Sequence, residues 1–388
     1  IIASETFSNC TSLTSLTIPD SVTNIERSAF WGCTGLTNIT IPDSVTSIGD
    51  SAFYNCTKLA NISIPNSITS IEDSTFWGCT GLMSITIPDS VTSIGTYAFR
   101  GCTSLLNITI PDSVTSIGWG AFNGCCSLSS ITIPDGVTSI YGSTFYGCGS
   151  LRSITIPSSI TSIGNQAFDG TKLYVINNNS DINVSFDSTS YGLVSDYTQL
   201  IVDKNGNKTY KAGTTDFELI DTSDGFRFAK INGEYRLIAY IGKEETATLP
   251  LDINGCEYKI YMMGGIRNII VPDGITSIDS NAFYNCSNLI SITMSNSVIS
   301  IDELAFFGCT NLASITIPDS VTSIGYLAFS GCSSLTSITI PDSVTSIESG
   351  AFDDCSSLTS LTIPDSVTSI GNSAFRGCSG LTSIIIPD

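Results

Sequence analysis

The sequence comprises 388 residues, of which 35 are acidic, 15 are basic and none is histidine, so its formal net charge is −20. A chain this negative repels nucleic-acid phosphates and anionic membrane surfaces, and it has no apolar stretch long enough to span a bilayer, so we expect neither nucleic acid binding nor membrane insertion. The missing histidine removes Ser-His-Asp and Cys-His catalysis and histidine metal sites, so we predict no enzyme activity, no metal and no cofactor.

A 23-residue period runs through the first part of the chain. It is visible in two residue types, which recur together at Pro19, Pro42, Pro65, Pro88, Pro111, Pro134 and Pro157 and at Cys10, Cys33, Cys56, Cys79, Cys102, Cys125 and Cys148. Two residue columns with one period indicate stacked copies of a single unit. We therefore predict a repeat array of about seven coils over residues 1–172.

One unit is predicted to form one coil of a β-rich solenoid. In residues 36–42 the apolar side chains of Leu36, Ile39 and Ile41 alternate with polar ones, which indicates a short strand that Pro42 ends. The following apolar residues return inward and close the coil before the next leucine. A single coil cannot bury this many apolar groups, so the strands of successive coils must stack in parallel.

The period stops near Leu173, and residues 173–245 form a segment that we call the island. Asn-Gly pairs at 205–206, 232–233 and 254–255 favour tight hairpins, most clearly in the sequence FRFAKINGEYRLIAYI of residues 226–241. The island either joins two arrays or binds a partner. In the second case, rigid aromatic anchors are available at Tyr191, Tyr197, Tyr210, Tyr235 and Tyr240.

A second array is predicted over residues 246–388, and its first coil is degenerate. Thr248-Leu249-Pro250 matches the Thr-Ile-Pro of the regular units, and the period assigns Ile260 to the Phe column and Met263 to the Cys column. The regular pattern then returns with cysteines at Cys286, Cys309, Cys332, Cys355 and Cys378.

The unit L-x-x-I-x-I-P-D-S followed by V-T-S-I-G-x-x-A-F-x-G-C resembles the BspA-like bacterial leucine-rich repeat. The resemblance covers residues 1 to about 171 and about 266 to 388, and the chain departs from it at Asn66, Thr171, Ser295 and Asn296. It implies a right-handed leucine-rich repeat coil. It also implies a surface or secreted bacterial protein associated with adhesion and with matrix proteins such as fibronectin and fibrinogen.

The periodic cysteines point to a structural role. One cysteine per coil at the same phase predicts an inward ladder of small apolar thiols, and no C-x-x-C pair of a zinc site is present. We expect free thiols, with pairing between neighbouring coils as the alternative, and Cys126 beside the ladder is the best candidate for a reactive one. The expected ladder members are Cys10, Cys33, Cys56, Cys79, Cys102, Cys125, Cys148, Cys286, Cys309, Cys332, Cys355 and Cys378.

Turn aspartates also recur once per coil. They form a row rather than a pocket, which disfavours a pair of catalytic carboxylates with different pKa values. Their interpretation as solvated turn caps competes with calcium binding between coils, although the glycine-rich pattern of calcium-binding β-rolls is absent. The row contains Asp20, Asp43, Asp89, Asp112, Asp135, Asp319, Asp342 and Asp365.

The outward residues of the predicted strands are small and polar. Stacked, they form a ladder of hydroxyl and amide groups that either recognises an extended partner, matches an ice lattice, or serves only as a soluble strand surface. The residues predicted for binding in the first array are Asn38, Thr40, Asn61, Ser63, Ser84, Thr86, Asn107, Thr109, Ser130 and Thr132.

These observations favour a non-catalytic binding or adhesion module that engages a protein partner on a host or neighbouring cell. A structural stalk and a glycan-binding island are the alternatives. We expect a monomer located outside the cell or at its surface. The chain opens in the middle of a unit, so we interpret it as a piece of a longer protein, and the absence of a signal peptide carries no information.

Overall fold

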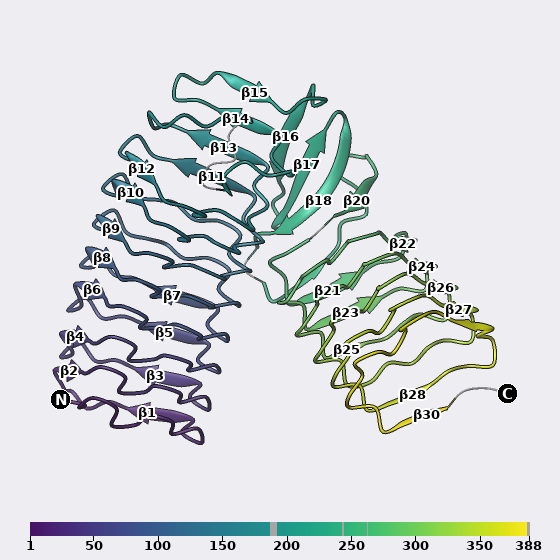
Figure 1. The fold of residues 1–388 in the computed structure, drawn as a ribbon, viewed down its shortest axis with the longest axis horizontal. Coiled ribbons are helices and arrows are strands. Elements are labelled where there is room, and N and C mark those ends of the chain that lie inside the picture. Colours follow the sequence, from purple (N-terminus) through teal and green to yellow (C-terminus); the bar gives the residue numbers. More distant parts are fainter. Residues whose placement is uncertain (187–191, 243, 262, 386–388) are drawn as a thin grey trace. The chain divides into compact units, whose positions relative to one another are not determined.

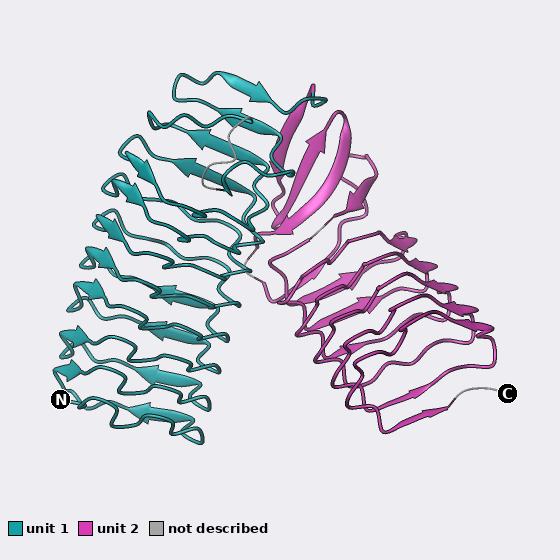
Figure 2. Cartoon of the chain, viewed as in Figure 1, with its two compact units in different colours: residues 1–214 teal, residues 215–388 magenta. Residues whose placement is uncertain are grey.

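The structure is a computed structural model that describes residues 1–186, 192–242, 244–261 and 263–385. The chain forms two compact units, residues 1–214 and residues 215–388. Figure 2 distinguishes them by colour, and each is described separately below. The division falls inside the island of residues 173–245, so this segment contributes to both units, and the three-part division remains a prediction.

Unit 1 is a solenoid with two columns of short parallel strands (Figure 1). The strands that pair come from equivalent positions of successive repeats, as in Ser15↔Asn38 and Asn24↔Ser47. The first column contains β1 (Ser15–Thr17), β3 (Asn38–Thr40), β5 (Asn61–Ser63), β7 (Ser84–Thr86) and β11 (Ser153–Ile156). The second column contains β2 (Asn24–Ile25), β4 (Ser47–Ile48), β6 (Ser70–Ile71), β8 (Ser93–Ile94), β9 (Ser116–Ile117), β10 (Ser139–Ile140) and β12 (Ser162–Ile163).

This solenoid, whose parallel strands recur with the period of the sequence, confirms the predicted fold. The second strand column was not expected, because the sequence analysis predicted one strand per unit. These strands have only two residues, a Ser or Asn outside and an Ile inside, which is too short for a periodic signal.

The core of unit 1 repeats coil by coil. In one coil Leu36, Val45, Ala52, Phe53 and Cys56 are all fully buried. The phenylalanines form a continuous stack from Phe7 to Phe168, with ring centroids 5.2 to 5.8 Å apart. Each coil therefore covers the apolar face of its neighbour, which is the source of stability in a solenoid.

The side of the coil that contains the A-F-x-G-C motif has no regular strand, yet its backbone bonds are made between coils. Phe30 N donates to Ala52 O at 2.8 Å, and Phe53 N donates to Thr75 O at 2.9 Å. The equivalent bond recurs from coil to coil through the array. Buried backbone groups are thus satisfied without secondary structure of their own.

Stacking in unit 1 continues beyond the residue at which the regular period stops. Strand β13 (Val175–Asn178) pairs in parallel with β11, and β14 (Leu200–Val202) pairs in parallel with β13. β15 (Lys208–Tyr210) then pairs antiparallel with β14 through the first Asn-Gly turn. Inward apolar residues persist here, including the buried Ile176 and Ile201. However, the partners of β13 no longer follow the spacing of the regular coils.

Unit 2 begins with an antiparallel sheet. Its strands β16 (Phe217–Asp221), β17 (Phe226–Ile231) and β18 (Glu234–Tyr240) pair in sequence, and β20 (Tyr258–Ile260) pairs in parallel with β18. The hairpin predicted for residues 226–241 is confirmed, with Asn232 and Gly233 both at positive φ. The Asn254-Gly255 turn is confirmed by the bridge between Ile253 and Cys256.

The remainder of unit 2 is a second solenoid. One strand column contains β19 (Thr246–Thr248), β21 (Asn268–Val271), β23 (Ser291–Met294), β25 (Ser314–Ile315), β28 (Ser360–Thr362) and β30 (Ser383–Ile385). The other contains β22 (Ser277–Ile278), β24 (Ser300–Ile301), β26 (Ser323–Ile324), β27 (Ser346–Ile347) and β29 (Ser369–Ile370). A second phenylalanine stack runs from Phe283 to Phe375.

The degenerate coil corrects one column assignment. Met263 N donates to Ala282 O at 2.8 Å, which is the bond that the phenylalanines make in regular coils. Met263 therefore occupies the Phe position, and the assignment of Ile260 to the Phe column and of Met263 to the Cys column was wrong. Both side chains are nevertheless buried, because the coil keeps its apolar face while its spacing changes.

Candidate binding surfaces

The strand face of unit 1 presents two polar columns that differ in how they are bonded. In the first column the side chains bond to each other, as Ser84 Oγ donates to Asn61 Oδ1 at 2.8 Å and Ser130 Oγ donates to Asn107 Oδ1 at 3.2 Å. Asn38 Nδ2 donates to Thr37 Oγ1 at 3.3 Å. Much of the hydrogen-bonding capacity of this column is therefore used within the chain.

The second column is exposed, and its hydroxyl groups make no hydrogen bond to any part of the chain that the structure describes. We call these residues the threonine column. In unit 1 it contains Thr17, Thr40, Ser63, Thr86, Thr109, Thr132 and Thr155. In unit 2 it contains Thr248, Thr293, Thr316, Thr339 and Thr362, and the exposed Ile270 interrupts it between the first two. Each hydroxyl can both donate and accept, so the column offers a partner a line of unused hydrogen-bonding groups.

A hollow interrupts the strand face in unit 2. In this strand column residues 337–340 form no regular ladder and pair with the neighbouring coils through the single bridges Ser314↔Ser337 and Ser337↔Ser360. A cavity of about 380 Å³ opens there, and its lining includes Thr339, Thr362 and the carboxylate residue Asp342. The threonine column and an acidic group thus meet in one depression.

The cysteine columns lie mostly inside the two cores, and every cysteine is a free thiol. The buried thiols other than Cys286 each donate to the backbone carbonyl of a phenylalanine in the previous coil. Cys56 Sγ lies 3.2 Å from Phe30 O and Cys79 Sγ lies 3.0 Å from Phe53 O, and the same contact recurs along both arrays. Burial raises the pKa of the Cys79 and Cys332 thiols to about 12.

The ends of the predicted cysteine ladder differ from its middle. Cys10 is exposed and Cys378 is half-buried, because only one neighbouring coil covers each of them. Cys126 is half-buried, and its Sγ lies 3.4 Å from Gly124 O. Cys256, in the Asn-Gly turn that precedes β20, is exposed.

The turn aspartates, such as Asp89 and Asp112, are exposed. In the described ranges no group of three or more His, Cys, Asp or Glu residues is placed to hold a metal ion. The serine that follows most of these aspartates has a clear structural role. Ser44 Oγ donates to Val22 O at 2.8 Å, and Ser90 Oγ donates to Ile68 O at 2.6 Å, which joins one coil to the preceding one.

The island tyrosines are not brought together in one site. Tyr197 and Tyr210 belong to unit 1 and are half-buried. The ring centroid of Tyr197 lies 6.4 Å from that of the buried Tyr174. Tyr235 and Tyr240 belong to unit 2. Tyr240 is only 3% exposed and packs in the core, so it cannot serve as a surface anchor.

Tyr191 lies outside the described residues, and the role of Tyr197, Tyr210 and Tyr235 in binding remains a prediction.

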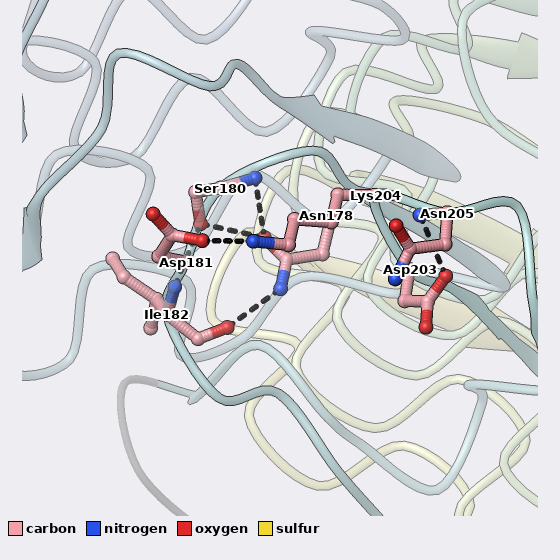
Figure 3. A network of polar contacts seen from close by, with 7 residues as sticks. All are labelled: Asn178, Ser180, Asp181, Ile182, Asp203, Lys204 and Asn205. Carbon is pink, nitrogen blue, oxygen red and sulfur yellow. Dashed lines mark hydrogen bonds and ion pairs between the residues drawn. The ribbon is translucent and has the colours of Figure 1, made fainter.

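A polar network within residues 178–205 closes the last coils of unit 1 (Figure 3). Asn178 is buried, and its partner in the neighbouring strand is the apolar Ile156. The Nδ2 atom of Asn178 donates to Ile182 O at 2.7 Å. Ser180 Oγ donates to Asn178 Oδ1 at 2.7 Å. The exposed Lys204 forms an ion pair with Asp181, which lowers the pKa of that carboxyl. The network replaces the apolar contacts of regular coils with turn hydrogen bonds, so we assign it a structural role.

An aromatic row on unit 1 escaped the sequence analysis. It consists of Trp31, Tyr54, Trp77, Tyr97 and Trp119, with successive ring centroids 3.9 to 5.2 Å apart. The Arg100 guanidinium lies 4.5 Å from the Trp77 ring centroid and 4.8 Å from that of Tyr97. Aligning the units would have revealed it, because three of its residues share the variable position of A-F-x-G-C or its equivalent.

No helix that could cross a membrane occurs in the part of the chain that the structure describes.

Comparison with known proteins identifies the repeat. A family model described as a BspA type leucine rich repeat region matches residues 1–88, 71–191 and 256–382, in six copies. No curated protein matches the chain.

Several solved structures are similar to this chain. A leucine-rich repeat protein from Bacteroides ovatus is 29% identical, with 96% of this chain and 86% of that chain covered and a TM-score of 0.38. A leucine rich cell surface protein from Faecalibacterium prausnitzii is 31% identical, with 96% and 87% covered and a TM-score of 0.35. A leucine-rich repeat protein from T. pallidum is 33% identical, with 40% and 75% covered and a TM-score of 0.38.

Proposed function

Because the chain belongs to the BspA-type leucine-rich repeat family, we propose that it is a non-catalytic adhesion module of a bacterial surface or secreted protein. Proteins of this family are typically found at the cell surface, and leucine-rich repeats typically bind other proteins. The partner in this proposal is a protein of a host or neighbouring cell. Fold alone does not select a partner, so the proposal depends on the surfaces of this chain.

The observation that carries the proposal is the threonine column. It runs along the strand face of both units, is exposed, and has hydroxyl groups that the described part of the chain leaves unused. In unit 1 part of the neighbouring polar column bonds internally, as in the Ser84 to Asn61 contact, so there the two columns are not equivalent.

The same face supports an extended partner. Thr86 and Thr109 are joined by a parallel bridge, so successive hydroxyls follow the stacking direction at roughly 5 Å, the ordinary distance between neighbouring strands. A partner lying along the column would meet one hydroxyl per coil. In unit 2 the hollow beside Asp342 would accept a side chain of that partner, and its carboxylate favours a basic one.

The test is a binding measurement with two double variants of equal charge. Thr86→Lys with Thr132→Lys places two bulky cations on the threonine column. Thr69→Lys with Ser116→Lys places two cations at or beside the second strand column, where both residues are also exposed and make no side-chain hydrogen bond to any described residue. Immobilised fibronectin and fibrinogen serve as the probes.

We expect the chain to bind at least one probe, the threonine-column variant to bind at least tenfold more weakly, and the control variant to remain within twofold. Equal effects of the two variants would remove the threonine column from the proposal. Failure to bind any matrix protein would contradict adhesion and favour a structural stalk.

A further inference from the structure

We infer that the aromatic row of unit 1 is a second docking surface, one that binds an arginine-bearing segment of a basic partner protein. The row is independent of the strand face, because its residues belong to the side of the coil that contains the A-F-x-G-C motif. All three tryptophans of the chain, Trp31, Trp77 and Trp119, lie in it. Trp, Tyr and Arg, the residue types of this row, are also those that dominate binding hot spots.

The row ends in rings that are open to solvent. Trp119 is 43% exposed, and in the next coil Tyr141 is 49% exposed and Tyr146 is 43% exposed. The earlier rings of the row are covered in part by each other, as in the stacked pair Trp31 and Tyr54 at 3.9 Å. The unused aromatic surface is therefore concentrated at one end of the row.

Two glycines leave room for these rings. Tyr97 has a φ of 56°, which is the ordinary backbone conformation at this position of the coil, since Leu304 and Leu327 of unit 2 have φ values of 57° and 53° there. The Tyr97 ring lies over Gly120, where an added Cβ would approach within 2.6 Å. The Trp119 indole lies over Gly142 in the same way, again with 2.6 Å to an added Cβ.

The same arrangement occurs in unit 2, where the Leu327 side chain lies over Gly350. The coil therefore accommodates a large side chain at this position in both units. In unit 1 the side chains that lie over these glycines are the aromatic rings of Tyr97 and Trp119.

The row itself shows which group it accepts. The Arg100 guanidinium lies 4.5 Å from the ring centroid of Trp77 and 4.8 Å from that of Tyr97. An arginine of this chain therefore already packs against the middle of the row. Arginine packs on aromatic faces better than lysine because its guanidinium is planar and weakly hydrated. Trp119 and Tyr141 offer comparable rings without a cation of this chain over them among the described residues.

The charges beside the row also select a basic partner. Asp50 and Asp73 occupy the same repeat position as Trp119 in earlier coils, and both are exposed. Neither forms an ion pair with any residue that the structure describes. These carboxylates lie two and three coils before the open ring of Trp119, where they would attract further basic side chains of an extended partner, and the overall charge of −20 adds long-range attraction.

The experiment uses the whole chain and a fluorescein-labelled ten-residue peptide of alternating Gly and Arg, whose anisotropy reports binding. Peptides of alternating Gly and Lys and of alternating Gly and Glu are compared with it, and cellohexaose tests a glycan instead. Intrinsic tryptophan emission locates the site, because every tryptophan belongs to the row. Trp119→Ser is the test variant, and Asp50→Asn with Asp73→Asn tests the charge.

The matched control is Tyr326→Ser in unit 2, because Tyr326 is 47% exposed and lies outside the row. We expect the Arg peptide to bind saturably, to change the tryptophan emission, and to bind more tightly than the Lys peptide. Trp119→Ser should weaken it at least tenfold and the aspartate double variant at least threefold, whereas Tyr326→Ser should stay within twofold.

Three outcomes would overturn the inference. Equal binding of the Arg and Lys peptides with no effect of Trp119→Ser would show that net charge alone attracts them. A response to cellohexaose but not to the Arg peptide would identify a glycan surface instead. Equal losses in Trp119→Ser and Tyr326→Ser would show that the row is not the site. None of these results depends on the threonine column, so the two proposals fail separately.

Discussion

At the scale of single residues, the cysteines show how a small side chain can stabilise a repeat. The sequence predicts an inward thiol at a fixed phase, but it does not reveal the acceptor. In the structure the carbonyl of Phe30 accepts both from Cys33 N at 3.2 Å and from Cys56 Sγ at 3.2 Å. The contact between Cys56 and Phe30 depends on how two coils are offset, which no local pattern contains.

The buried thiols predict a loss of stability at alkaline pH. In the unfolded chain a thiol ionises near its usual pKa of 9.0, whereas burial raises the pKa of Cys79 to about 12 in the folded chain. Folding therefore favours the protonated form, so the stabilisation is complete below pH 9 and is lost as the pH rises from about 9 to about 12.

Cys79→Ala should reduce the drop in unfolding free energy between pH 8 and pH 10 by on the order of 1 kcal/mol, measured by urea unfolding at both pH values. Cys10→Ala is the control, because Cys10 is exposed. The same pH dependence in all three proteins would argue against ionisation of the buried thiol as the cause.

At the scale of structural elements, the longer strand column and the turn after Pro42 follow from the repeat pattern, as do the Asn-Gly hairpins. Two features do not. The two-residue strands such as β4 are too short for periodicity to detect, and β13 and β14 follow a changed spacing that the regular period cannot predict. The aromatic row likewise does not follow from the consensus of the repeat, because its residues occupy variable positions of different coils.

The phenylalanine stack predicts a strong dependence on position within an element. Phe76 is fully buried between the rings of Phe53 and Phe99, whereas Phe7 is half-buried and has a ring neighbour on one side only. Phe76→Ala should cost about 3–5 kcal/mol, and Phe7→Ala should cost clearly less, because its side chain leaves less buried volume empty. Urea unfolding followed by tryptophan fluorescence measures both, and equal costs would contradict the stacked core.

At the scale of the whole molecule, two cores divide the chain, one from Ile18 to Ile201 and the other from Phe226 to Ala374. The sequence predicts the two arrays because their periods are separate. It does not predict that residues 173–245 are shared between the two units, since the pairing of β13 with β11 and of β18 with β20 depends on strands outside that segment. The loss of the period at Leu173 marks altered spacing rather than the end of stacking.

Two cores predict two unfolding transitions. All three tryptophans lie in unit 1, so tryptophan fluorescence reports that unit, whereas circular dichroism reports both. Unit 1 has the longer regular phenylalanine stack, and solenoid stability grows with the number of stacked neighbours. We expect circular dichroism to change at lower urea than fluorescence. Coincident curves would show that the chain unfolds as one cooperative unit.

The constant offset between coils has a consequence for how such genes change. Each regular coil donates to the next coil at the same positions, as Phe30 N does to Ala52 O, so adding or losing a whole coil restores the same pairings at the new junction. Array length can therefore change in steps of one coil while every coil keeps its contacts, whereas a deletion smaller than a whole unit displaces every column that follows it.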